Sequence, residues 1–178
     1  MSGSVLSVAL SARHTFSKTP QARIEVVADR GVRGDAHFGV TVKHRSRVGK
    51  NAQAPNLRQV HLMPVEILEQ IGAAGYPIKP GDTGENVLTT GVDLLSLGRG
   101  TRLSIGGAVL EVTGMRNPCH QLDKFAPGLR RALAPKREDG GIDRLAGVMA
   151  IVVTGGHIAP GDTIQIRTPP IHTPLEVV

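Results

Sequence analysis

Glycine and proline interrupt this chain so often that most of it is expected to form short strands and turns rather than long helices. The 178 residues include 22 glycines and 12 prolines, and both residue types punctuate regular structure. Only Phe16, Phe38, Phe125 and Tyr76 are aromatic. The core must therefore be aliphatic.

Several segments have the alternating or β-branched apolar pattern of strands. We predict strands at residues 5–10, 23–28 and 59–63, three more between residues 79 and 115, and two at 148–154 and 163–167. Gly106-Gly107 lies between two apolar stretches and predicts a tight hairpin. Val148–Thr154 is apolar almost throughout, so we expect a buried central strand.

Helices are expected at two places. Pro64 is placed to open a helix that carries Val65, Leu68 and Ile71 on one face and stops near residues 72–75. Residues 117–147 are helical or irregular, with a short helix near residues 127–133. The segment 31–39 contains three glycines and is not expected to be regular.

About seven short strands with few helices predict a mainly β fold, a closed and mainly antiparallel β-barrel with a few short peripheral helices. No linker divides the chain, so residues 1–167 are predicted as one domain and residues 168–178 as an extended tail. The tetrapeptide Pro-Gly-Asp-Thr occurs at 80–83 and again at 160–163. Each copy is typical of a turn that leads into a strand.

The positive charge lies almost entirely in the first third of the chain. Residues 1–58 contain ten lysines and arginines against three acids, whereas the remaining 120 residues carry a net charge of −1. Such an excess indicates either a solvated basic face or a site for an anion. Nucleic acid is an unfavoured partner, because single strands bind through aromatic stacking and aromatics are scarce here.

The chain gives no sign of a membrane or export signal. No apolar run reaches the ~18 residues that a membrane helix needs, and the N-terminus lacks the basic start of a signal peptide. With one cysteine there is no intrachain disulfide. The expected location is cytoplasmic.

Cys119 is the first candidate for chemistry. A lone cysteine is often a small buried hydrophobe, but Pro118 should end the preceding strand and place Cys119 on a loop. The flanking Arg116 and His120 favour a thiolate. That thiolate is suited to three roles: a covalent nucleophile, a persulfide carrier or a soft metal ligand.

The histidines leave two further options open. His37, His44 or His61 is a possible through-space partner for Cys119, and the four residues together are a possible zinc site, although no pair has the short spacing of zinc motifs. His14, His157 and His172 are expected to be ordinary surface or hydrogen-bonded residues.

Two glycine-containing motifs are candidate binding loops. In GVRGDAHFG, residues 31–39, glycines allow backbone N–H groups near an anion and Arg33 offers a fork to phosphate. In GDTGEN, residues 81–86, Glu85 and Asn86 offer polar groups at the start of a strand, and Asn86 is suited to a ligand amide or ring nitrogen.

Together these motifs resemble the MOSC domain, the C-terminal domain of eukaryotic molybdenum cofactor sulfurases, which also occurs as small bacterial proteins. The resemblance lies in GVRGDAHFG, TVKHRSR, NLRQVHL and the long stretch from GDTGENV to RNPCHQL, and it covers residues 5–166. It implies a β-barrel of the pyruvate-kinase barrel type and binding of the molybdenum cofactor, a pyranopterin phosphate whose dithiolene holds Mo.

The resemblance also implies roles for residues. The family's cysteine corresponds to Cys119, which ligates Mo in relatives that reduce N-hydroxylated compounds and is proposed to carry sulfur in sulfurases. His37 is suited to holding an oxo ligand or a water. The residues expected to bind the cofactor and its phosphate are Arg33, Gly34, Asp35, Lys43, Arg45, Arg47, Arg58, Asn86 and Arg116.

The implied function is reduction of N-hydroxylated bases or related N-oxygenated small molecules, with Cys119 as both catalytic residue and metal ligand. The alternative is a sulfur carrier, or a cofactor-binding module, that serves another molybdoenzyme. One cysteine cannot hold an iron–sulfur cluster, so an external electron donor, or for the alternative an external cysteine desulfurase, is the expected partner. Pyridoxal phosphate is not expected to bind, because in the sulfurases it belongs to a separate N-terminal domain.

Overall fold

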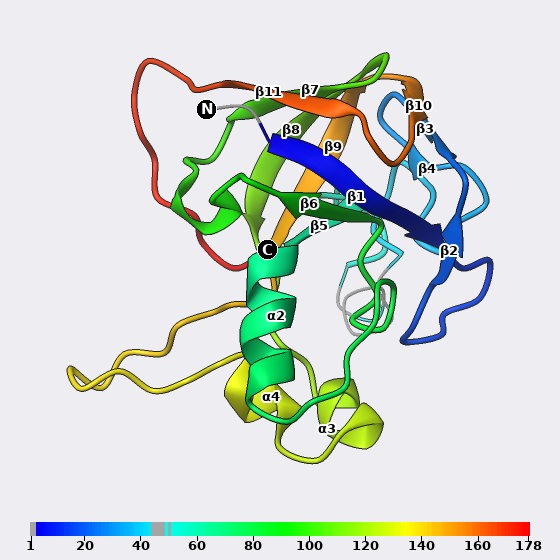
Figure 1. Cartoon of the computed structure of the whole chain (residues 1–178). Helices are drawn as coiled ribbons and strands as arrows, with labels where there is room; N and C mark the ends of the chain where they lie inside the picture. The colour runs from blue at the N-terminus through cyan, green and yellow to red at the C-terminus, as the bar shows by residue number, and fades with distance from the viewer. Residues whose placement is uncertain (1–2, 44–48, 50) are drawn as a thin grey trace.

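The computed structural model describes residues 3–43, 49 and 51–178, and Figure 1 shows the order of the elements along the chain. The strands of the described residues are β1 Gly3–Leu10, β2 Thr19–Gln21, β3 Ile24–Val27, β4 Gly31–Val32, β5 Val60–Pro64, β6 Val87–Thr90, β7 Arg102–Ile105, β8 Ala108–Met115, β9 Val148–Thr154, β10 Gly156–Ile158 and β11 Thr163–Arg167. The helices are α2 Val65–Ala73, α3 Gln121–Phe125, α4 Leu129–Ala132 and the 3₁₀ helix η1 Leu94–Ser96.

Within the described residues, seven strands form a closed barrel, which confirms the predicted fold class. Their order is β11-β7-β8-β9-β5-β6-β1, and pairing of Gly3 with Ile164 and of Ser4 with Thr163 closes the ring between β1 and β11. All neighbours run antiparallel except β5 and β6. Those two are parallel because α2 carries the chain back across the barrel between them.

The barrel core is aliphatic, as the scarcity of aromatics predicted. Its buried residues are valines, leucines, isoleucines and alanines. The predicted central strand Val148–Thr154 is β9, which lies between β8 and β5 and is buried along most of its length. The predicted hairpin at Gly106-Gly107 joins β7 to β8.

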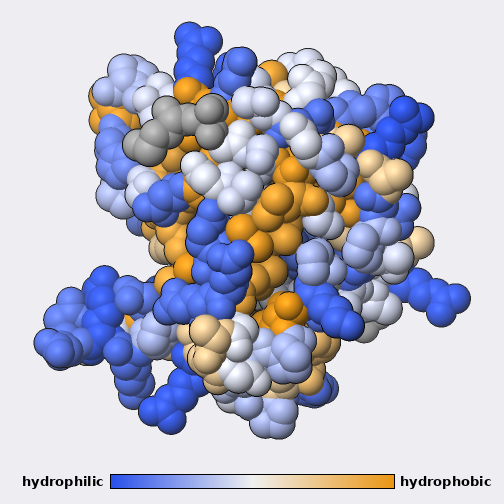
Figure 2. All heavy atoms as spheres, viewed as in Figure 1, coloured by the Kyte–Doolittle hydropathy of each residue, from blue (hydrophilic) through white to orange (hydrophobic). Residues whose placement is uncertain are grey.

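Helices α2, α3 and α4 lie together at one end of the barrel (Figure 1). Leu68 and Ile71 of α2 are buried in a second apolar cluster with Leu122 of α3 and Leu129 of α4. Pro64 is the last residue of β5, and α2 begins at the next residue, Val65. The helix therefore begins one residue later than predicted. Figure 2 shows apolar side chains gathered on this face between the barrel strands and α2.

One local expectation needs correction, and a second is made more specific. The segment 31–39 is not wholly irregular, because Gly31 and Val32 form the short strand β4, which pairs with β3. The segment 117–147 contains α3 in addition to the helix expected near residues 127–133. A five-residue helix is too short to show the apolar periodicity that predicts helices.

Both Pro-Gly-Asp-Thr copies form the same turn. Asp82 accepts a hydrogen bond from the backbone N–H of Lys79 at 2.8 Å, and Asp162 accepts one from Ala159 at 2.8 Å. Gly81 and Gly161 have φ of +90° and +92°, values that favour glycine. The second copy leads directly into β11, whereas three residues separate the first from β6.

The C-terminal residues lie along β8. Backbone N–H groups of Arg99 and Met115 donate to the carbonyls of Thr173 and Glu176, and Leu175 is buried against the barrel core. No helix among the described residues has the length and apolar content needed to cross a bilayer.

Two glycines with similar backbone angles provide a matched test of the packing. Gly147 has φ +79°, and a Cβ there would meet the carbonyl oxygen of Leu62; Gly100 has φ +82° and open space around it. We expect Gly100→Ala to cost about 1–2 kcal/mol for the left-handed conformation, and Gly147→Ala roughly 1–3 kcal/mol more because the backbone of β5 must shift. Urea unfolding measures both, and equal losses of unfolding free energy would contradict the close approach at Gly147.

Candidate functional site

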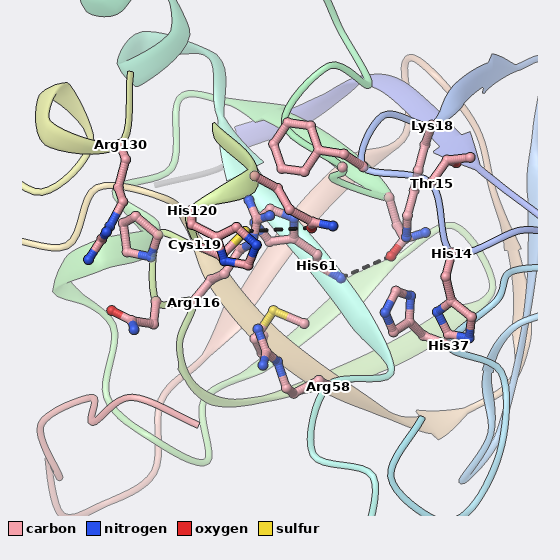
Figure 3. Close-up of a pocket in the computed structure, with 17 residues that line it drawn as sticks. His14, Thr15, Lys18, His37, Arg58, His61, Arg116, Cys119, His120 and Arg130 are labelled. Atoms are coloured by element: carbon pink, nitrogen blue, oxygen red, sulfur yellow. Dashed lines mark hydrogen bonds between the residues drawn. The ribbon is translucent and has the colours of Figure 1, made fainter. Parts of the chain in front are cut away.

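A cavity of about 590 Å³ opens beside the loop that follows β8 (Figure 3). Its wall comes from segments far apart in the chain: the loop between β1 and β2, the loop after β4, β5 and the residues around it, the turn before β6, the loop after β8, α3, α4 and β9. The lining residues are His14, Thr15, Phe16, Lys18, His37, Arg58, His61, Gly84, Asn86, Arg116, Asn117, Pro118, Cys119, His120, Gln121, Arg130 and Met149.

A buried carboxylate, Asp35, fixes one side of this cavity. Its Oδ2 lies 2.9 Å from Nζ of Lys18 and accepts hydrogen bonds from Asn86 Nδ2 and the backbone N–H of Ser11, both at 3.2 Å. Its Oδ1 accepts from the backbone N–H of His37 at 3.0 Å and lies 3.2 Å from His37 Nδ1. One carboxylate thereby holds the positions of Lys18, Asn86 and His37.

The electrostatics of this group follow from burial and pairing. Burial alone would raise the pKa of Asp35, but the hydrogen bond from His37 and the charge of Lys18 hold that pKa well below its usual range. Burial lowers the pKa of Lys18, and the Asp35 carboxylate partly offsets this effect. The pair is therefore best described as an ion pair with its charges satisfied inside the protein.

Asn86 uses both of its side-chain N–H groups within the fold. Nδ2 donates to the carbonyl of Ala9 at 3.1 Å and to Asp35, while Oδ1 accepts from the backbone N–H of His61 at 3.1 Å. The structure therefore gives Asn86 a positioning role between β1 and β5, which differs from the expected role of reading a ligand. Glu85 likewise holds its own turn, since it accepts hydrogen bonds from Gly81 N and Thr83 Oγ1.

His61 on β5 is a neutral, buried histidine. Burial lowers the pKa of His61 well below its ordinary value, and the charge of Arg116 lowers it further. Its Nε2 lies 2.7 Å from the carbonyl of Ala146. Because a carbonyl only accepts, Nε2 carries the proton and donates it.

Cys119 lies on the short loop between β8 and α3, as its sequence context predicted. The pairing of β8 with β9 ends there, since Pro118 has no N–H to continue the ladder, and the Cys119 carbonyl then accepts from Leu122 N at the start of α3. The thiol is free and half-buried, with Sγ 3.7 Å from Oε1 of Gln121.

Arg116 is held firmly behind the thiol. Its Nη1 donates to the carbonyl of Thr83 at 2.7 Å, and its guanidinium lies 5.9 Å from the centre of the Phe16 ring. Burial lowers the pKa of Arg116, while negative charge at Cys119 and Glu85 raises it. A guanidinium stays protonated under such conditions, so a permanent positive charge faces the Cys119 loop.

The structure brings most of the predicted site together. Cys119, His37, Arg58, Asn86 and Arg116 line the same cavity, and Asp35 lies behind them.

Other predicted binding residues lie elsewhere. The exposed Arg33 pairs with Glu25 at 2.7 Å across β3 and β4, Gly34 forms an exposed turn, and Lys43 packs against Gly39; none of the three lines the cavity. Arg45 and Arg47 lie outside the described residues. Within the described residues, no three His, Cys, Asp or Glu side chains are grouped to hold a metal ion, so the structure does not support the zinc option; His44 is not described.

Sequence reasoning assigned no role to Lys18, Phe16, Arg130 or Met149, all of which line the cavity. Lys18 is one of the basic residues in the first third of the chain, but it lies in no recognisable motif that would have singled it out. Arg130 lies in a part of the chain with no net positive charge, so the charge distribution did not predict an anion-binding residue there.

Comparison with known proteins identifies the family of this fold. The model of the MOSC domain family matches residues 33–165. The crystal structure of the YuaD protein from Bacillus subtilis is 26% identical, with a TM-score of 0.78 over 95% of this chain and 97% of that one. No curated protein sequence matches the chain.

More distant structures share the fold alone. YiiM from Geobacillus stearothermophilus is 19% identical, with a TM-score of 0.67 over 97% of this chain and 79% of that one. YiiM from Escherichia coli is 17% identical, with a TM-score of 0.64 over 98% of this chain and 73% of that one.

Breaking the buried ion pair should destabilise the protein strongly. Asp35→Asn leaves the Lys18 charge buried without its partner, so we expect a loss of about 3–5 kcal/mol in unfolding free energy. Adding Lys18→Met should recover part of this loss. Glu25→Gln, which breaks the exposed pair with Arg33, is the matched control and should change stability little. An Asp35→Asn variant as stable as Glu25→Gln would contradict the proposed importance of the pair.

His61 should make stability depend on pH. Its pKa is lower in the folded protein than in the unfolded chain, so its contribution is complete above about pH 6.5 and is lost as the pH falls further. We expect a slope of about 1.4 kcal/mol per pH unit between roughly pH 6 and 5. His61→Gln keeps a donor for the Ala146 carbonyl and should reduce this slope in urea titrations at each pH. An unchanged slope would show that another group is responsible.

Proposed function

This chain belongs to the MOSC domain family, and we propose that it binds the molybdenum cofactor in the cavity beside Cys119 and reduces N-hydroxylated bases or related N-oxygenated compounds there. MOSC domains are associated with this cofactor. The observation that carries the proposal is the donor set of the cavity. One soft thiol lies among cationic side chains, and among the described residues no aspartate or glutamate side chain lines the wall.

The residues present suit the cofactor. Thiolates are favoured ligands of soft metals, and Cys119 is the only cysteine in the chain. The cofactor's phosphate is anionic, and arginine and lysine bind phosphate through charge-assisted hydrogen bonds. A volume of about 590 Å³ lies within the range of small-molecule sites, roughly 300–1,000 Å³.

Gly84 shapes the cavity wall. Its φ is +82°, and a Cβ there would meet the Phe16 carbonyl. Glycine therefore lets the turn before β6 lie close to the Phe16 segment at the cavity wall, with Arg116 behind it.

Reduction of an N–OH group to N–H breaks the N–O bond, takes up two electrons and two protons, and releases water. The bound cofactor supplies the two-electron redox chemistry, and an external donor protein must return the electrons. This chain's own residues bind and orient. Cys119 is the proposed Mo ligand, and Arg58 and Arg116 are the proposed anchors for anionic groups of the cofactor.

His37 is the proposed residue for the oxygen of the substrate. Asp35 holds its Nδ1, which sets the orientation of the ring at the cavity wall. Asp35 thus acts through His37 and Lys18 as a positioning residue and touches no reacting atom.

A half-buried free thiol on a cavity wall also suits the second candidate, a persulfide carrier that takes sulfur from a cysteine desulfurase. In that case Cys119 alone carries the chemistry. The two candidates differ in what is bound to the purified protein.

Elemental analysis for Mo tests the proposal. The protein and its Cys119→Ser variant are purified from a host that makes molybdenum cofactor. We expect near-stoichiometric Mo in the wild type and its loss in the variant. Purified without cofactor, the two proteins should unfold at the same temperature, because a thiol-to-hydroxyl change on a loop perturbs packing little. Normal Mo in the variant would contradict Cys119 as ligand. A Cys119 persulfide without Mo, seen by mass spectrometry, would support the sulfur carrier.

A further inference from the structure

The four Lys and Arg side chains of the cavity wall differ in how many of their hydrogen-bond donors are bonded to other protein groups. Lys18 pairs with Asp35, and Arg116 donates to Thr83 and faces the Phe16 ring. Arg58 is half-buried and lies two residues before β5. Arg130 is exposed, and among the described residues its guanidinium has no hydrogen-bond or ion-pair partner, since only its backbone N–H is bonded, to Asp123.

Arg130 also differs in position. In Figure 3, Cys119 lies between Arg130 on one side and Lys18, His14 and His37 on the other. Arg130 is the second residue of α4, whose neighbouring residues Leu129 and Leu133 are fully buried. The base of the side chain is therefore anchored, while its long arm reaches the cavity from the helical end of the molecule.

The two sides are suited to different ligands. The side that contains Asp35 is built from strand ends and a buried ion pair, so its geometry is set before a ligand binds, which favours a cofactor that stays bound. A guanidinium whose donors are unused presents a planar fork that matches one carboxylate. No acidic side chain lines the described wall; Asp123, outside it, accepts a hydrogen bond from the backbone N–H of Arg130.

We propose that the substrate carries a carboxylate and that Arg130 binds it, which places the reacting part of the substrate beside Cys119. This inference deepens the proposed function and rests on it. It gives Arg130 the role of a specificity-determining residue and predicts that acidic N-hydroxylated compounds are preferred over their neutral counterparts.

Alkylation of Cys119 tests the attraction of a carboxylate without any cofactor or turnover. The full-length chain is purified from a host that makes no molybdenum cofactor and treated with iodoacetate or iodoacetamide. In both reactions the thiolate forms an S–C bond and iodide leaves with the electron pair of the C–I bond. Because the reagents are of similar size and Cys119 is the only cysteine, the ratio of their rates cancels the thiolate fraction and reports the effect of the carboxylate charge.

The chain offers a matched control for this experiment. Arg131 is the next residue of α4, is also exposed and lines a different hollow with Tyr76 and Lys136. We expect Arg130→Gln to lower the iodoacetate-to-iodoacetamide ratio roughly three- to fivefold at low ionic strength, and Arg131→Gln to leave it nearly unchanged. High salt should remove the difference between wild type and Arg130→Gln. An unchanged ratio in Arg130→Gln, or an equal fall in both variants, would overturn the proposal.

The Mo-loaded protein provides the second measurement. With an external electron donor, we compare an aryl amidoxime with the same compound carrying a carboxylate on its ring. Arg130→Gln should raise KM about three- to fivefold for the acidic compound only, with kcat retained; an equal effect on both compounds would overturn the proposal. Absence of Mo would defeat the proposed function, whereas the alkylation ratio still judges Arg130 independently.

Discussion

The Asp35 carboxylate joins parts of the molecule that are far apart in the chain. It contacts the loop between β1 and β2 through Ser11 and Lys18, the start of β6 through Asn86, and the cavity wall through His37. A buried charge is costly unless it is paired and hydrogen-bonded, and here both Asp35 oxygens are used. The ion pair and hydrogen bonds that offset the cost of burying the carboxylate also fix the positions of the residues in one wall of the cavity.

Much of the fold was predictable because turns interrupt the sequence at the ends of its strands. The predicted segments 148–154 and 163–167 coincide with β9 and β11, since Gly147 and Gly155 bracket the first and a Pro-Gly-Asp turn precedes the second. The parallel pairing of β5 with β6 and the second sheet of β10, β3 and β4 were not predicted. Strand partners depend on long-range packing, which local patterns do not encode.

The candidate site was predictable where chemistry and loop position coincide, as at Cys119 and Arg116. It was not predictable where a side chain's partner comes from elsewhere in the chain. Arg33 had suitable neighbours in sequence, but its guanidinium pairs with Glu25. Asn86 was predicted to hydrogen-bond a ligand, but its two N–H groups donate to the Ala9 carbonyl and the Asp35 carboxylate. Local sequence patterns identify reactive side chains, but they do not show which polar side chains are already hydrogen-bonded to other parts of the protein.

This difference between occupied and unoccupied groups is itself informative about function. Lys18, Asn86 and Arg116 contribute charge or shape to the cavity, but their hydrogen bonds go to the protein, so they make a stiff wall. Arg130 contributes charge from an exposed side chain on a short helix. This side chain can therefore change its conformation to fit a bound substrate. A retained cofactor benefits from preorganised groups, whereas a substrate that must leave after each turnover needs contacts that form and break readily. The cavity has one wall of each kind, with the single thiol between them.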